Sequence, residues 1–168
     1  MLLAVPAVSA LATAAPAWLT AYQQHELALG RGLAVLGGWA LLNMLVSGYQ
    51  LPRADARRWP HHFHLMNCGW AVVNAVLAAV GILRTHPGVP PPGFSAAAAL
   101  ADQTLTGYIF AGNALLDVGY VLLGAWLLVR AAAPAARRPE RSFGYGRSIQ
   151  LQGAFLLVFD VGMYVWLR

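Results

Sequence analysis

The chain has 168 residues, of which 59% are hydrophobic and only 10% are charged. Soluble domains carry about 25% charged residues, so this composition excludes an ordinary soluble domain and favours lipid as the surrounding medium. The formal net charge of +5 does not predict nucleic-acid binding, because the arginines lie between the apolar segments and form no single basic face.

The N-terminal segment, residues 1–15, resembles the end of a secretory signal peptide. It is apolar and contains Ala12-Thr13-Ala14, a small-residue cleavage pattern, although no basic residue precedes Arg31. A cleavable signal and an uncleaved short membrane segment both remain open. Residues 16–30 carry aromatic and polar side chains and predict a short interfacial helix that leads into the first span.

Four apolar segments are long enough to cross a membrane, which takes about 20 residues each. They run from about 31 to 51, 62 to 83, 107 to 129 and 148 to 167. The sequence therefore predicts an all-α fold, an integral membrane four-helix bundle, with residues 16–168 as a single domain. Between the second and third spans, a proline-rich stretch precedes a possible short surface helix at 96–106.

The arginines predict the orientation of these spans. Eight of them follow span one or span three, and three lie on the other side. Because arginine-rich loops stay in the cytoplasm, we expect a bacterial inner-membrane protein with both termini extracytoplasmic.

A short motif recurs inside the spans. GWALLN ends at Asn43, GWAVVN at Asn74 and GNALLD at Asp117, and VFDVGMY in span four places Asp160 as LLDVGY places Asp117. Each of these four residues lies ten to twelve residues into its span, which is about 15–18 Å into a core about 30 Å thick. Polar groups at that depth are costly unless they face inward, so we expect them to meet near the midplane. Internal duplication and chance similarity both remain possible origins of the pattern.

Helical spacing extends this polar cluster. Asn113 and Tyr120 share a helix face with Asp117, and Gln152 and Tyr164 lie on a broad common face with Asp160. The two tryptophans of the GWA motifs stand four residues before their asparagines and are expected to pack the motif rather than to anchor at the membrane surface.

The blocks GGWALLN, FHLMNCGWAVVN, NALLDVGY and GYGRSIQLQGAFLLVFD together carry a family resemblance. Over most of residues 20–165, the chain resembles an uncharacterised family of small bacterial four-span membrane proteins. The resemblance implies an exported N-terminus followed by four membrane helices, and it implies no activity.

Three hypotheses for function follow. In the first, the protein is an accessory or structural membrane protein, and its polar side chains join the helices by hydrogen bonds worth about 0.6 kcal/mol each. In the alternative, Asp117 and Asp160 bind a proton or a cation in a transporter or channel subunit, flanked by Asn43 and Asn74, because paired carboxyls lose their protons in separate steps. The third is a membrane-embedded enzyme or a binder of a metal or quinone. We favour the first hypothesis and keep proton or cation binding as the alternative. The third is least favoured, because the sequence carries no Walker loop, dinucleotide-binding glycine motif, GxSxG elbow or HExxH motif.

Three histidines, His61, His62 and His64, form the one candidate metal site. Neighbouring histidines on one helix point about 100° apart, so the three converge only if Pro60 breaks the helix. We otherwise expect no cofactor. The expected partners are membrane lipid and a second copy of the chain or a larger membrane complex, because four spans are few for a transport path within one chain.

Overall fold

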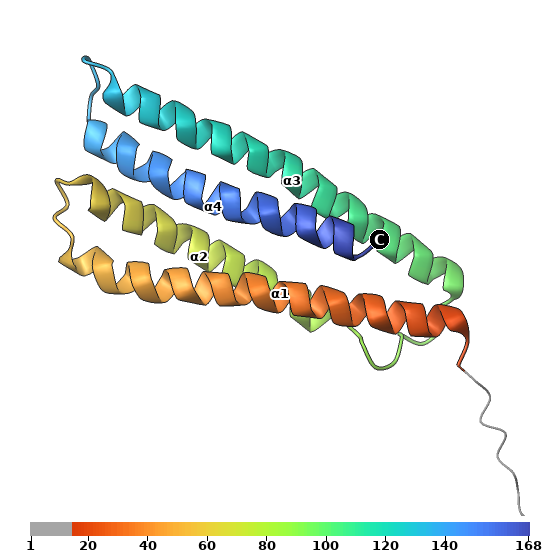
Figure 1. The fold of residues 1–168 in the computed structure, drawn as a ribbon. Coiled ribbons are helices and arrows are strands. Elements are labelled where there is room, and N and C mark those ends of the chain that lie inside the picture. Colours follow the sequence, from red (N-terminus) through yellow and green to blue (C-terminus); the bar gives the residue numbers. More distant parts are fainter. Residues whose placement is uncertain (1–14) are drawn as a thin grey trace, which may run out of the picture.

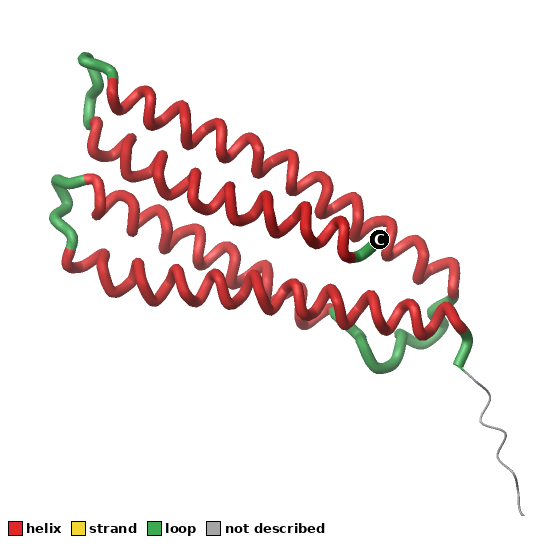
Figure 2. Tube along the Cα trace, viewed as in Figure 1, coloured by secondary structure: helices red, strands yellow, loops and turns green. Residues whose placement is uncertain are grey.

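The computed structural model describes residues 15–168 and consists of four long helices (Figures 1 and 2). The helices are α1 (Ala17–Gln50), α2 (Trp59–Arg84), α3 (Ala96–Ala132) and α4 (Pro139–Trp166), and the short 3₁₀ turn η1 (Leu51–Arg53) follows α1. All four are long and apolar enough to cross a membrane. The predicted all-α, four-helix fold is confirmed, and the signal-like segment lies outside the described residues except for Ala15.

Local sequence signals set the helix boundaries. Pro60 and Pro139 stand in the first turns of α2 and α4, where proline needs no backbone hydrogen-bond donor. Ser95 caps α3, and its hydroxyl accepts a hydrogen bond of 3.2 Å from the backbone N–H of Ala98. The start of α2 and the ends of all four helices lie within a few residues of the predicted span boundaries.

Three helices, α1, α3 and α4, begin well before their predicted spans. The segment 16–30 is not a separate helix, because α1 runs without interruption from Ala17 to Gln50. Likewise, 96–106 forms the first turns of α3 rather than a separate surface helix. No proline lies within any of these helices after its start, so nothing in the backbone chemistry ends the first turns before the apolar span begins. At 37 residues, α3 is about 55 Å long, and its first turns extend past the C-terminal end of α4 (Figure 1).

Helices that follow each other in the chain run antiparallel, and packing joins α1 to α2 and α3 to α4. α4 lies along α3 and also along α2, and α2 lies along α1. Within the described residues, the backbones of α2 and α3 do not approach each other closely. The connections α1–α2 and α3–α4 lie at one end of the bundle, and the α2–α3 connection lies at the other end (Figure 2). The bundle therefore has an α1–α2 end, which also carries the α3–α4 connection, and an opposite α2–α3 end.

Glycines allow α3 and α4 to approach each other. A methyl group added at Gly146 would lie 2.9 Å from the carbonyl oxygen of Gly124, and one added at Gly124 would lie 2.9 Å from that of Gly146. Small residues at helix contacts are the usual means of close packing in membranes. This contact fixes the position of α4 between α2 and α3.

The polarity of the bundle is reversed relative to a soluble protein. Large apolar side chains such as Leu45, Leu115 and Val158 are exposed on its outside. The largest fully buried side chains are Gln152, Asn74, Ser47 and Ser148. An apolar exterior around a polar interior is the distribution that lipid favours.

Candidate functional site

A hydrogen-bonded cluster, called here the amide network, joins three of the four helices. α3 contributes nothing to it. Its members are Trp39, Asn43 and Ser47 of α1, His64, Asn67 and Asn74 of α2, and Ser148 and Gln152 of α4.

Gln152 is the centre of the amide network and is fully buried, with 0% of its surface exposed. Its Oε1 accepts hydrogen bonds from Trp39 Nε1 at 2.9 Å and from Asn74 Nδ2 at 3.3 Å. Its Nε2 donates to Asn67 Oδ1 at 2.6 Å and to Asn43 Oδ1 at 3.3 Å. Because an amide carries both donors and an acceptor, one side chain of α4 joins both α1 and α2.

The amide network continues toward the α1–α2 end of the bundle. Asn67 Nδ2 donates to Asn43 Oδ1 at 2.7 Å and to Ser47 Oγ at 2.9 Å. His64 Nδ1 lies 3.1 Å from the same Ser47 hydroxyl. From Asn74 to His64 the network extends for about 15 Å along α2, so this half of the interior is filled with mutually bonded side chains.

Asp117 of α3 and Asp160 of α4 form a separate pair. Their carboxyl groups line one cavity, together with the amide of Asn113. Both acids are buried, at 3% and 5% exposed. The second oxygen of Asp117, Oδ2, is buried and has no hydrogen-bond partner within residues 15–168.

This acid pair lines a partly open cavity of about 300 Å³, to which all four helices contribute side chains. The cavity walls are mainly apolar and aromatic, and their polar groups come from Asp117, Asp160, Asn113, Asn74 and Tyr120. Asn74 belongs to both the cavity and the amide network, so the two features adjoin at this side chain. The arrangement is able to hold a small polar species against the carboxyls.

The predicted cluster therefore divides into two parts. Asn43, Asn74, Asp117 and Asp160 are all buried, as their expected inward orientation requires. Asn43 bonds within the amide network, however, and does not flank the acids. The physical reason is distance along the helices: Gln152, which binds Asn43, precedes Asp160 by eight residues, or about 12 Å.

The two predicted tyrosines lie in different places. Tyr120 lines the cavity, and its ring meets that of Trp70 edge-on at 4.9 Å. Tyr164 lies near the end of α4, under the guanidinium of Arg168 at 4.1 Å, and does not line this cavity. Trp39, which bonds Gln152 and stacks on Phe155 at 4.1 Å, packs the GWA motif as predicted.

The three histidines of α2 are not brought together. His61 and His62 meet edge-on at 5.5 Å, whereas His64 turns to Ser47. Because α2 continues unbroken beyond Pro60, the rings fan out around the helix as its geometry dictates. In residues 15–168, no group of three His, Cys, Asp or Glu side chains is placed to hold a metal ion.

Asn67 and Ser148 are central to the amide network but were not among the predicted site residues. Their signal was present in the spacing: Asn67 precedes Asn74 by seven residues, and Ser148 precedes Gln152 by four, which places each pair on one helix face. The repeated motif does not include them, so a search for repeats alone misses them.

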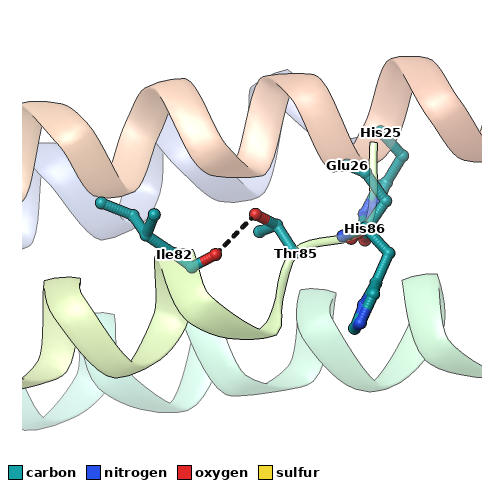
Figure 3. Close-up of polar contacts among 5 residues, drawn as sticks. All are labelled: His25, Glu26, Ile82, Thr85 and His86. Carbon is teal, nitrogen blue, oxygen red and sulfur yellow. Dashed lines mark hydrogen bonds and ion pairs between the residues drawn. The ribbon is translucent and has the colours of Figure 1, made fainter. Parts of the chain in front are cut away.

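A second polar contact ties α1 to the α2–α3 end (Figure 3). Glu26, which is 4% exposed, accepts a hydrogen bond of 2.7 Å from the backbone N–H of His86, just beyond α2. The hydroxyl of Thr85 bonds the carbonyl oxygen of Ile82 at 2.8 Å. His25 Nδ1 lies 3.7 Å from the Glu26 carboxylate. The early turns of α1 thus hold the connection that leads to α3.

Four membrane-length helices with an apolar exterior and a polar interior define the architecture of a multi-pass membrane protein. Residues 35–161 match a family of unknown function, DUF6992, and the chain belongs to that family. No curated protein and no solved structure matches it. The expected membership of an uncharacterised family is thereby confirmed.

Proposed function

We propose that the protein binds a proton at the Asp117–Asp160 pair inside the membrane, and that the amide network holds the bundle around this site. The observation that carries the proposal is that the acid pair and the amide network are separate clusters. The amide network satisfies its own hydrogen bonds without either acid. A purely structural role accounts for the amides and leaves two buried carboxyls unexplained.

The surroundings of the pair favour a proton over a metal cation. Both carboxyls are buried in the same cavity, which a shared proton permits and two negative charges oppose. Among the described residues, Asp117 Oδ2 has no partner and is free to accept a further proton or water. Of the other side chains that line the cavity, only Tyr120 titrates; α1 contributes leucines, and α2 contributes an indole, an amide and aliphatic groups.

The setting of this site follows from the arginine distribution. The protein lies in a bacterial inner membrane with both termini extracytoplasmic, and the α1–α2 and α3–α4 connections are cytoplasmic. One cavity within four helices is small for a complete transport path, so the working unit includes lipid and a second copy of the chain or a larger complex.

Infrared difference spectra recorded between acid and alkaline pH on purified protein test the proposal. The wild-type pair should titrate in two coupled steps. Asp117→Asn and Asp160→Asn should each leave a single step, because one member of the pair has been removed. Asp55→Asn changes an exposed carboxylate in the α1–α2 connection and should preserve both steps of the pair.

The titrations are compared between variants whose thermal unfolding matches that of the wild type. If Asp117→Asn and Asp160→Asn leave the carboxyl titration unchanged, the pair is structural and the proposal fails. Repeating the titration over a range of sodium concentrations separates the two ligand types. A shift of the titration with sodium would replace the proton by a cation.

A further inference from the structure

A second cavity, called here the vestibule, lies at the α2–α3 end of the bundle and has a volume of about 430 Å³. Its lining is much more polar in character than that of the first cavity. It includes Tyr22 and Glu26 of α1, Arg84 and His86 around the end of α2, and Asp102 and Thr106 of α3. Since a water molecule occupies about 30 Å³ in the liquid, this space accommodates several waters with polar partners.

The vestibule and the cavity of the acid pair are neighbours. Leu33, Ile109 and Phe110 line both of them. Phe110 is the buried aromatic member of the three, at 6% exposed, and its ring lies 6.2 Å from that of Phe159. The two spaces are therefore separated by a few side chains and not by a packed layer of backbone.

One face of α3 runs along both spaces. Asp102, Thr106, Asn113 and Asp117 follow one another at intervals of four, seven and four residues, which places them on a single helix face. From Asp102 to Asp117 this face is about 22 Å long. Polar side chains of α3 thus lie along the path from the vestibule to the acid pair.

On the other side of the acid pair, the outer surface between α2 and α3 forms an open, apolar groove of about 400 Å³, lined by Met66, Trp70 and Leu123 among others. The interior on that side is occupied by the amide network, whose members Gln152, Asn74, Ser47 and Ser148 are the largest fully buried side chains. Their amides are engaged with one another. Access from the α1–α2 end is therefore closed by packed side chains.

We propose that protons reach the Asp117–Asp160 pair from the α2–α3 end alone, through water in the vestibule and along the polar face of α3, with Phe110 as the side chain that controls passage. This inference rests on the proposed function for its ligand, whereas the route itself stands on the geometry. Glu26, Asp102 and Arg84 line the vestibule, so its walls carry charged groups of both signs that offer partners to water.

Cysteine accessibility tests the route independently of proton binding. The chain has one cysteine, Cys68, so Cys68→Ala supplies a background without thiols. Thr106→Cys and Asn113→Cys place probes in the vestibule and in the cavity of the pair. Leu115→Cys is the matched control, because Leu115 lies at nearly the same depth as Asn113 but is 76% exposed on the outside.

The reagent is a membrane-impermeant cationic methanethiosulfonate, applied to either face of oriented proteoliposomes. Both probes should react from the face that carries the α2–α3 connection, Asn113→Cys more slowly than Thr106→Cys. Leu115→Cys should not react. Adding Phe110→Ala should accelerate labelling of Asn113→Cys several-fold, and Phe110→Trp should slow it. Leu36→Cys, at a position that lines the cavity of the pair and is only 5% exposed, replaces Asn113→Cys if that variant does not fold.

Labelling of the cavity probe from the α1–α2 end, from both faces equally, or no faster than Leu115→Cys would overturn the proposed route. The infrared titration decides the ligand separately. One-sided labelling with an unchanged titration in the aspartate variants would retain the route and reject proton binding. A normal coupled titration without one-sided labelling would retain proton binding and reject the route.

Discussion

At the scale of single residues, the interior depends on side chains that both donate and accept hydrogen bonds. The carbonyl oxygen of Gln152 accepts hydrogen bonds from α1 and α2, and its amino group donates hydrogen bonds to the same two helices. Lipid offers no competing hydrogen bonds to such a group, and a buried amide that loses its partners is costly. The carboxyls of the acid pair have fewer partners, which is why a ligand is assigned to them and not to the amides.

Replacing the central amide should weaken the fold. We expect Gln152→Leu, which keeps the volume and removes the bonds, to lower the free energy of unfolding by about 1–3 kcal/mol. The matched control is Gln24→Leu on α1, which replaces an exposed glutamine; there we expect a change within about 0.5 kcal/mol. Unfolding in mixed micelles with increasing denaturing detergent measures both. Equal effects would mean that the amide network adds no stability.

At the scale of helices, α3 and α4 have opposite characters. α4 is the most buried of the four helices and α3 the least, although the two pack along each other. Gly124 and Gly146 permit this contact, and it leaves one face of α3 open to the two cavities. The helix α3, which carries the polar face, is therefore held in the bundle mainly by its contact with α4.

A methyl group at this contact should separate the two helices. We expect Gly146→Ala to cost about 1–3 kcal/mol, because its new methyl would meet backbone that cannot turn aside. Gly119→Ala on α3 meets nothing within 4 Å, and alanine favours helix by up to about 1 kcal/mol, so this control should be neutral or stabilising. The same detergent unfolding assay compares them, and a stabilising Gly146→Ala would contradict the close packing.

At the scale of the whole molecule, the two ends of the bundle differ in access. The α2–α3 end holds the vestibule, and the α1–α2 end is closed by the amide network. If the arginine-rich connections are cytoplasmic, the acid pair exchanges protons with the extracytoplasmic side. The orientation in the membrane thus decides which compartment the site senses.

Fluorescent-protein fusions test this orientation. A reporter that becomes fluorescent only in the cytoplasm should be bright when fused after Ala133, in the α3–α4 connection, and dark when fused after Arg168. Immunoblots of both fusions supply the control for expression. The opposite pattern would reverse the membrane orientation and place the vestibule on the cytoplasmic side.

Much of this architecture was predictable from the sequence. Four apolar segments, the inward orientation of Asn43, Asn74, Asp117 and Asp160, and the packing role of Trp39 all follow from the cost of placing polar groups in lipid. That cost acts on each helix by itself, so a single helix reveals which of its faces must turn inward.

The tertiary structure alone decided which polar groups meet. The repeated motif suggested one cluster, but the acids of α3 and α4 line one cavity, while the asparagines bond to Gln152 and to Asn67. The cavity and the vestibule likewise depend on how far α2 and α3 stand apart. Each helix sequence fixes the direction of its side chains about its own axis, but the offset and spacing between helices come from the packing of all four together.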